Sequence, residues 1–98
     1  MNDIDLNIWK NDHNGCLGER ASMIDSFHKQ KQKLLGLSEM EIISLLGKPD
    51  QNELYDRNQK FYHYYFDPSS SCEQPVSNPH KLSIRFNAMG LAKEVAVE

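Results

Sequence analysis

Cys16 and Cys72 carry the most reactive side chains of this 98-residue sequence, and each has a histidine not far away along the chain. His13 lies three residues before Cys16, and His80 lies eight residues after Cys72. Neither spacing matches the close ligand pairs of zinc fingers, so we predict no metal site; a site of two cysteines and two histidines is the alternative. A Cys16–Cys72 disulfide would close a long loop and is typical of an oxidising compartment, whereas two independent thiols are the other interpretation.

No combination of side chains predicts an enzyme. An imidazole at His13 could favour the thiolate of Cys16, but the pair lies in a glycine-rich segment rather than in a pocket. His63 falls inside a predicted strand, where a half-exposed structural histidine is the simpler interpretation. Gly15 and Gly18 lack the preceding strand that a phosphate-binding loop requires. We therefore expect no catalytic residues and no cofactor.

Composition limits the classes of protein to which the chain can belong. Its 98 residues have room for one hydrophobic core, and a charged fraction of 26% is ordinary for a globular domain. The formal net charge of -3 disfavours a nucleic-acid partner. No apolar run approaches the roughly 20 residues of a transmembrane helix. We expect the periplasm or cell envelope if a signal segment is removed ahead of Met1, and the cytoplasm if Met1 is the native start.

A short helix that begins after Ser38 is the clearest structural signal. Ser38 is a good N-cap, and Glu41 lies three residues on, where its carboxylate can accept from the amide of the cap. Gly47 supplies the residue that closes the helix, and Pro49 prevents its continuation. The chain must therefore turn in a new direction after this helix.

Two segments precede that helix. Residues 1–18 are rich in asparagine, aspartate and glycine, and we predict an irregular arm that packs Trp9 onto the body of the domain. Residues 19–98 are predicted to form one domain, which starts with a helix over residues 19–35. The inward positions of that helix are predicted to be Ile24, Phe27, Leu34 and Leu35.

After the second helix the apolar pattern changes to a period of two. The segment 51–60 is predicted to be a polar connection with a turn at residues 56–59. Antiparallel strands are predicted over residues 61–66, 82–87 and 91–98. Residues 69–80 form a long loop. The predicted fold class is α+β, with two N-terminal helices packed on one face of a three-stranded antiparallel sheet in the order ααβββ.

Alternate residues of the predicted strands fall on opposite faces of the sheet. Those assigned to the core are Tyr62, Tyr64, Phe66, Leu82, Ile84 and Phe86. Phe61, His63, Tyr65 and Arg85 then lie on the other face, and we predict them as partner-binding residues, because aromatic and arginine side chains are typical of interface centres. The alternative is that the arm with Trp9 folds over this face and completes the core.

Several short motifs follow one another within residues 36–95: Gly36-Leu37-Ser38, Glu41-Ile42, Leu46-Gly47-Lys48-Pro49, Tyr62-His63-Tyr64-Tyr65-Phe66 and Leu82-Ser83-Ile84-Arg85-Phe86-Asn87-Ala88-Met89-Gly90-Leu91. In order and spacing they resemble the SmpA/OmlA (BamE-like) family of small outer-membrane assembly lipoproteins. The resemblance implies a two-helix, three-strand domain that is not an enzyme and docks onto other components of an envelope machine. The same fold is reused in secreted inhibitors of β-lactamase, so the fold alone does not determine a partner.

We therefore expect a non-enzymatic protein-binding or scaffold domain of the bacterial cell envelope. The alternative is a soluble inhibitor or immunity-type module that binds and blocks a target enzyme through residues 67–80. A third alternative, a small thiol-dependent enzyme, requires a free Cys16. The lysines at positions 29, 31 and 33 are interpreted as a solvated helix end, with peripheral contact to anionic lipid headgroups or to an acidic partner as the alternative. The sequence carries no signal for the oligomeric state.

Overall fold

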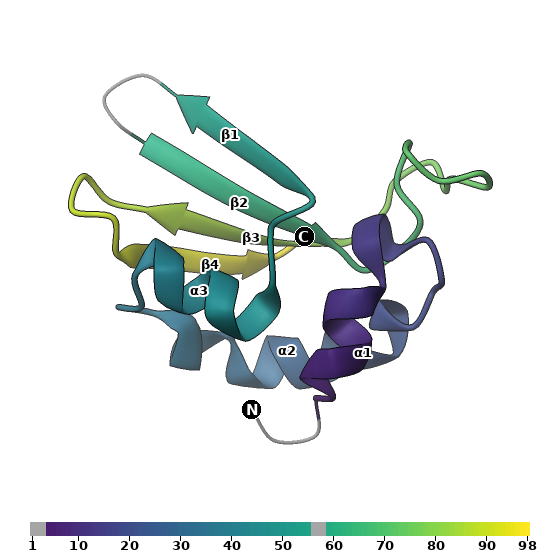
Figure 1. The fold of residues 1–98 in the computed structure, drawn as a ribbon, viewed down its shortest axis with the longest axis horizontal. Coiled ribbons are helices and arrows are strands. Elements are labelled where there is room, and N and C mark those ends of the chain that lie inside the picture. The colour runs from purple at the N-terminus through teal and green to yellow at the C-terminus, as the bar shows by residue number, and fades with distance from the viewer. Residues whose placement is uncertain (1–3, 56–58) are drawn as a thin grey trace.

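The computed structural model describes residues 4–55 and 59–98, which form one helical layer and one sheet (Figure 1). The α-helices are α1 (Leu6–Asn11), α2 (Ile24–Gln30) and α3 (Glu39–Leu46). The 3₁₀-helices are η1 (His13–Gly15), η2 (Arg20–Met23) and η3 (Lys31–Leu34). The strands are β1 (Gln51–Tyr55), β2 (Gln59–Tyr65), β3 (Lys81–Phe86) and β4 (Ala92–Val97). The predicted α+β class is confirmed, but the described residues contain three α-helices and four strands rather than two and three.

The sheet is antiparallel and its strands follow one another in the order β1-β2-β3-β4. Tyr62 lies opposite Ile84, and Ile84 lies opposite Val95. These three side chains form a row across β2, β3 and β4 on the face that the helices cover. This alternation confirms the predicted inward set, because all six of its side chains are buried: Tyr62, Tyr64, Phe66, Leu82, Ile84 and Phe86.

Strand β1 is the part of the sheet that the sequence failed to predict. The segment was expected to be a polar connection, because Leu54 and Tyr55 are the only residues before the predicted turn that are not strongly polar. As an edge strand, β1 pairs with β2 alone, and Leu54 is 75% exposed. Backbone pairing rather than an apolar face holds it in place, so the apolar alternation that identifies a half-buried strand is absent. The predicted turn at 56–59 falls mostly on residues 56–58, which lie outside the described residues.

The predicted second helix is confirmed in detail as α3. The Ser38 hydroxyl accepts from the amide of Glu41 (3.2 Å), and the Glu41 carboxylate accepts from the amide of Ser38 (3.1 Å). Gly47 follows the last turn with a φ of 82°, a backbone angle that residues with a Cβ rarely adopt. The capping box therefore starts this helix and glycine ends it, as expected.

The single helix predicted over residues 19–35 is divided into η2, α2 and η3. Phe27 and Leu34 are fully buried as predicted, but Leu35 is 44% exposed, and its inward assignment is wrong. The physical reason is that the chain tightens to a 3₁₀ turn before Leu34 and becomes extended at Leu35, which turns the latter side chain away from the core.

The segment predicted as an irregular arm contains helix α1. Asp5 caps this helix, since its carboxylate accepts from the amides of Asn7 and Ile8. Trp9 is fully buried, and its ring lies 4.4 Å from that of Phe27, between centroids. The expectation that Trp9 packs onto the body of the domain is confirmed.

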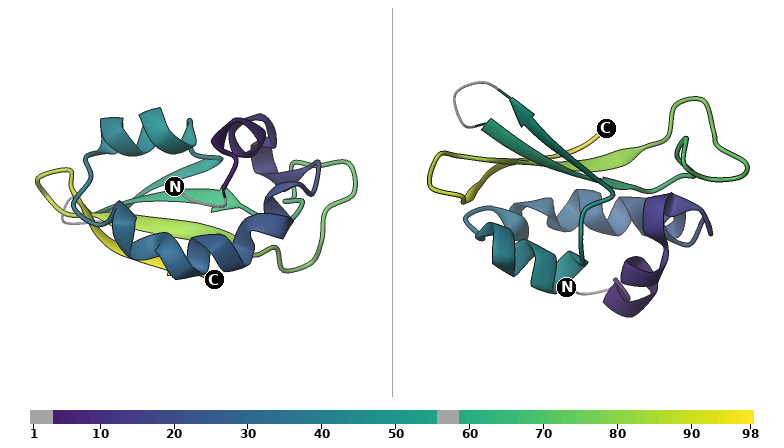
Figure 2. Two further views of the ribbon diagram at one scale, coloured as in Figure 1. Left: turned by 90° about the horizontal axis from the view of Figure 1, so that it is seen from below. Right: turned by 45° about the horizontal axis from the view of Figure 1, so that its top comes forward.

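Within the described part of the chain, the helices and the arm all lie on one side of the sheet, and no helix covers the opposite face (Figure 2). Trp9 contacts Tyr64 and Phe66, with ring centroids 5.9 and 5.3 Å away, and both belong to the helix-covered face. The alternative in which the arm covers Phe61 and His63 is therefore wrong. Among residues 4–55 and 59–98, no helix has the length and apolar character needed to cross a membrane.

Candidate binding surface

The sheet face opposite the helices, here called the open face, brings the four predicted contact residues together on two neighbouring strands. Phe61 lies directly opposite Arg85, and Tyr65 lies opposite Lys81 across the β2–β3 pair. His63 stands between them on β2. The period of two along a strand and the register between strands are sufficient to produce this grouping.

His63 is the centre of the open face and is only 5% exposed, although none of the described helices covers it. Its Nδ1 lies 2.8 Å from the Ser83 hydroxyl, and the ring of Phe61 stacks against it with centroids 5.9 Å apart. Its Nε2 lies 2.9 Å from a carboxylate oxygen of Glu53, at ion-pair distance but outside the angles of a hydrogen bond. His63 is therefore shielded by its neighbours and offers little surface of its own to a partner.

Burial is the main reason why the pKa of His63 lies below its ordinary value of 6.5. The positive charge of Lys81 lowers this pKa further, and the carboxylate of Glu53 opposes the shift. The imidazole is therefore neutral at neutral pH. A neutral, buried ring adds no charge to the centre of the open face.

The remaining predicted contact residues lie around this centre and are partly exposed. Tyr65 donates its hydroxyl to the side-chain oxygen of Gln51 (2.8 Å). Arg85 lies 3.6 Å from the carboxylate of Glu94, the residue opposite it on β4. Such solvent-accessible pairs are weak, so a partner that offers better geometry can replace them.

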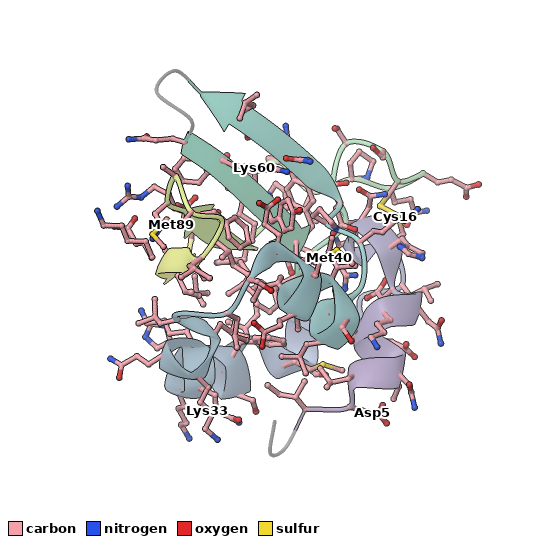
Figure 3. The ribbon with its side chains drawn as sticks, turned by 60° about the vertical axis from the view of Figure 1, so that its left-hand side comes forward. Asp5, Cys16, Lys33, Met40, Lys60 and Met89 are labelled. Atoms are coloured by element: carbon pink, nitrogen blue, oxygen red, sulfur yellow. A yellow bond between two sulfur atoms is a disulfide. The ribbon has the colours of Figure 1, made fainter. Side chains whose placement is uncertain are left out.

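The predicted disulfide between Cys16 and Cys72 is confirmed (Figure 3). Because both sulfurs are bonded, Cys16 is neither a free nucleophile nor a zinc ligand in this structure. The His80 ring is paired with another group, since its Nδ1 lies 2.7 Å from the carboxylate of Asp67. Within the part of the chain that the structure describes, no group of three or more His, Cys, Asp or Glu side chains could hold a metal ion.

A buried ionic cluster formed by Asp12, Arg20 and Asp50 was not predicted from the sequence. The guanidinium of Arg20 lies 2.6 Å from the Asp50 carboxylate, and both side chains are 1% exposed. Arg20 also donates to the carbonyls of Trp9 (2.9 Å) and Tyr65 (3.1 Å). The guanidinium carbon lies 4.3 Å from the centroid of the Trp9 ring, which adds a cation–π contact.

The two carboxylates of this cluster are satisfied mainly by backbone amides. Asp12 accepts from the amides of Leu17 (2.6 Å) and Arg20 (3.0 Å). Asp50 accepts from the amides of Asn14 (3.0 Å) and Tyr65 (2.8 Å). Sequence patterns carry no signal for these contacts, because the residues are far apart along the chain and each looks like an ordinary surface charge.

The same end of the sheet also holds the loop of residues 67–80. The amide of Ser69 donates to the carbonyl of Asn14 (3.0 Å), next to the disulfide. A shallow pocket of about 450 Å³ lies beside the disulfide, and its lining includes Leu17, Pro68 and Glu73. The arm and the loop therefore form one surface at this end, separate from the open face.

Comparison of the chain with protein-family models, with curated proteins and with solved structures finds no match. The similarity to the SmpA/OmlA (BamE-like) family remains a prediction that rests on the sequence motifs and on the helix–sheet order.

Proposed function

We propose that the chain is a non-enzymatic protein-binding or scaffold domain of the bacterial cell envelope that contacts its partner through the open face. One observation carries the proposal: the helical layer covers a single face of the sheet, and the uncovered face groups Phe61, Tyr65 and Arg85 around a buried centre. A protein interface commonly has aromatic and arginine side chains at its centre and charged groups at its rim.

The charges of the open face support this arrangement. Arg85–Glu94 and Lys81–Glu98 pairs lie towards one edge of the sheet, at 3.6 and 3.8 Å. His63 is buried and neutral in the middle, so a partner would not have to desolvate a charge there. The Cys16–Cys72 disulfide supports an envelope location, because such bonds persist in oxidising compartments.

Photocrosslinking tests the proposal because it captures a partner whose identity is still open. Arg85→p-benzoylphenylalanine in the full chain, expressed in the source bacterium, should give a discrete covalent adduct in the envelope fraction. Ser44→p-benzoylphenylalanine, at an exposed position of α3, is the matched control and should give none. With the partner identified, Arg85→Ala should weaken binding by about tenfold or more. Equal crosslinking from both positions would contradict the proposal.

A second candidate function is an inhibitor or immunity-type module that binds a target enzyme through residues 67–80. The disulfide and the Ser69–Asn14 hydrogen bond hold this loop against the arm, which would lower the entropic cost of binding. Glu73→p-benzoylphenylalanine distinguishes the two candidates. An adduct of Glu73 with a soluble enzyme, and none from Arg85, would favour the inhibitor.

A further inference from the structure

Part of the outer edge of β4 has no backbone partner among residues 4–55 and 59–98. Lys81 and Glu98 exchange both of their backbone hydrogen bonds, at 3.0 and 2.9 Å. Because these bonds alternate in direction along an antiparallel pair, the N–H and C=O groups of Val95 and Val97 point away from β3. No hydrogen bond among the described residues uses these four groups. They form a short edge that an extended chain could pair with.

The chain itself already pairs with an adjacent part of this edge. The amide of Gly36 donates to the carbonyl of Ala92, and the amide of Ala92 donates to the carbonyl of Leu37, both at 2.8 Å. Ser38 forms a bridge with Leu91. Residues 36–38 therefore act as a short added strand along the start of β4, and no other described segment pairs with the edge from Val95 onward.

A small pocket of about 200 Å³ adjoins the unpaired edge. It lies where η3 packs beside β4, and its lining consists of Lys31, Gln32, Leu35, Lys93, Glu94 and Val95. Two lysines from different elements thus meet at one pocket, and neither makes an ion pair with a described residue. Leu35, whose exposure contradicted the sequence prediction, belongs to the apolar part of the lining with Val95.

The local charge is positive although the chain as a whole has a net charge of -3. Lys29 and Lys33 are exposed on the same helical segment as Lys31, and Lys33 projects outward from it (Figure 3). Glu94 is the one acid in the lining, and its carboxylate lies 3.6 Å from Arg85 of the open face. The pocket is therefore complementary to an added carboxylate.

We propose that the outer edge of β4 and the Lys31–Lys93 pocket together bind an extended acidic peptide segment of a partner protein. The peptide backbone pairs with Val95 and Val97, and one of its carboxylates lies between Lys31 and Lys93. An apolar side chain two residues away from that carboxylate, on the same face of the peptide strand, packs on Leu35. Strand addition of this kind derives affinity from backbone hydrogen bonds and specificity from the side-chain pocket.

The outward N–H and C=O groups of Val95 and Val97 favour a peptide over a lipid bilayer, because a headgroup surface has no extended backbone that could pair with them. This surface also differs from the open face: Val95 and Val97 point towards the helices, whereas Arg85 and Glu94 lie on the uncovered side. The inference therefore goes beyond the proposed function, and either one can fail alone.

Selection from a displayed library of random peptides tests the inference with the full, oxidised chain. Enriched peptides should carry Asp or Glu two residues away from an aliphatic residue, within a segment of high strand propensity. Titration with a synthetic copy should shift the amide NMR signals of Val95, Val97 and Lys93 more than that of Phe61. The double variant Lys31→Gln/Lys93→Gln should weaken binding by about tenfold or more, because two charge pairs are lost.

Two controls separate strand addition from general charge attraction. Lys48→Gln removes one exposed charge away from the pocket and should change the affinity by less than about twofold. N-methylation of alternate residues of the selected peptide should abolish binding, since it removes the backbone donors that pair with β4. Unchanged binding of the methylated peptide would overturn the inference.

Other results would also overturn it. Enrichment of peptides without acids, or NMR shifts centred on Phe61 and Arg85, would assign the binding to another surface. If no peptide is enriched and vesicles of mixed neutral and anionic phospholipid bind the wild type but not the double variant, the ligand is a membrane. If neither binds, the lysines only guard an exposed strand edge against aggregation.

Discussion

His63 illustrates at the scale of one residue how the open face is built. Its place in a strand predicted a half-exposed side chain, yet the ring is almost completely enclosed by Phe61, Ser83 and Glu53. Neighbouring side chains on a twisted sheet can bury a residue without any second layer. This burial is the main cause of the lowered pKa of His63, because a buried site favours the neutral imidazole over the charged one.

We expect the protein to lose stability as the pH falls below the ordinary histidine pKa of 6.5. The unfolded chain then binds a proton at His63 while the folded state, whose pKa is lower, still does not. The stability that neutral His63 contributes is fully present above pH 6.5. It is lost as the pH falls from 6.5 towards the lower pKa of His63 in the folded state. Thermal unfolding between about pH 7.5 and about pH 5 measures it.

Two replacements make this prediction specific. His63→Gln should flatten the pH dependence in that range, whereas His28→Gln, at an exposed position of α2, should leave it unchanged. Glu39, whose pKa is lowered mainly by its hydrogen bond to Lys60, affects stability only in a more acidic range, because its ordinary pKa is 4.5. If the thermal stability of the wild type, of His63→Gln and of His28→Gln changed with pH in parallel, the role of His63 would be contradicted.

At the scale of elements, local chain signals decide where α3 begins and ends but not how the first helical segment is divided. The capping box at Ser38 satisfies two amides that have no partner within the helix. No comparable cap is found where η2, α2 and η3 meet. There, packing of Phe27 and Leu34 on the sheet determines the path of the chain.

Ser38→Ala should therefore lower the free energy of unfolding by about 1 kcal/mol, the usual value of a lost N-cap. Ser44→Ala, at an exposed position inside the same helix, is the matched control and should change it by less than about 0.5 kcal/mol. Urea denaturation followed by circular dichroism provides both values. A loss in Ser44→Ala as large as that in Ser38→Ala would show that the cap itself contributes nothing.

At the scale of the whole molecule, the Asp12–Arg20–Asp50 cluster joins the N-terminal arm to the end of the sheet. Arg20 contacts Trp9 of α1, Asp50 at the start of β1 and Tyr65 at the end of β2. The disulfide adds a covalent link between the arm and the loop of residues 67–80. One end of the fold thus depends on contacts between segments that are distant in sequence.

Arg20→Ala should destabilise the protein by roughly 3–5 kcal/mol, because it leaves the Asp50 carboxylate buried without its counter-charge. Arg85→Ala, which breaks a more exposed pair, should cost about 1 kcal/mol or less. The double variant Arg20→Met/Asp50→Asn should be less damaging than Arg20→Ala, since the Asp50 carboxylate is also removed and Asp12 keeps the two backbone amides that donate to it. Equal midpoints of urea unfolding for Arg20→Ala and Arg85→Ala would refute a structural role for the cluster.

The features that depend on neighbouring residues were predictable from the amino-acid sequence alone. The capped helix α3, the alternation of buried side chains in β2 and β3, and the grouping of Phe61, Tyr65 and Arg85 on one face follow from local propensity and from the period of two. The Cys16–Cys72 bridge was one of several interpretations that the sequence left open, and the structure selected it.

The features that depend on contacts between distant residues became visible only in the folded chain. Strand β1 is held by its pairing with β2, and helix α1 is too short to be stable unless Trp9 is buried. The burial of Arg20 and the meeting of Lys31 with Lys93 bring together charges that are far apart along the chain. Charged residues of this kind have no periodic pattern, so their placement becomes visible only when the sheet and the helical layer are assembled.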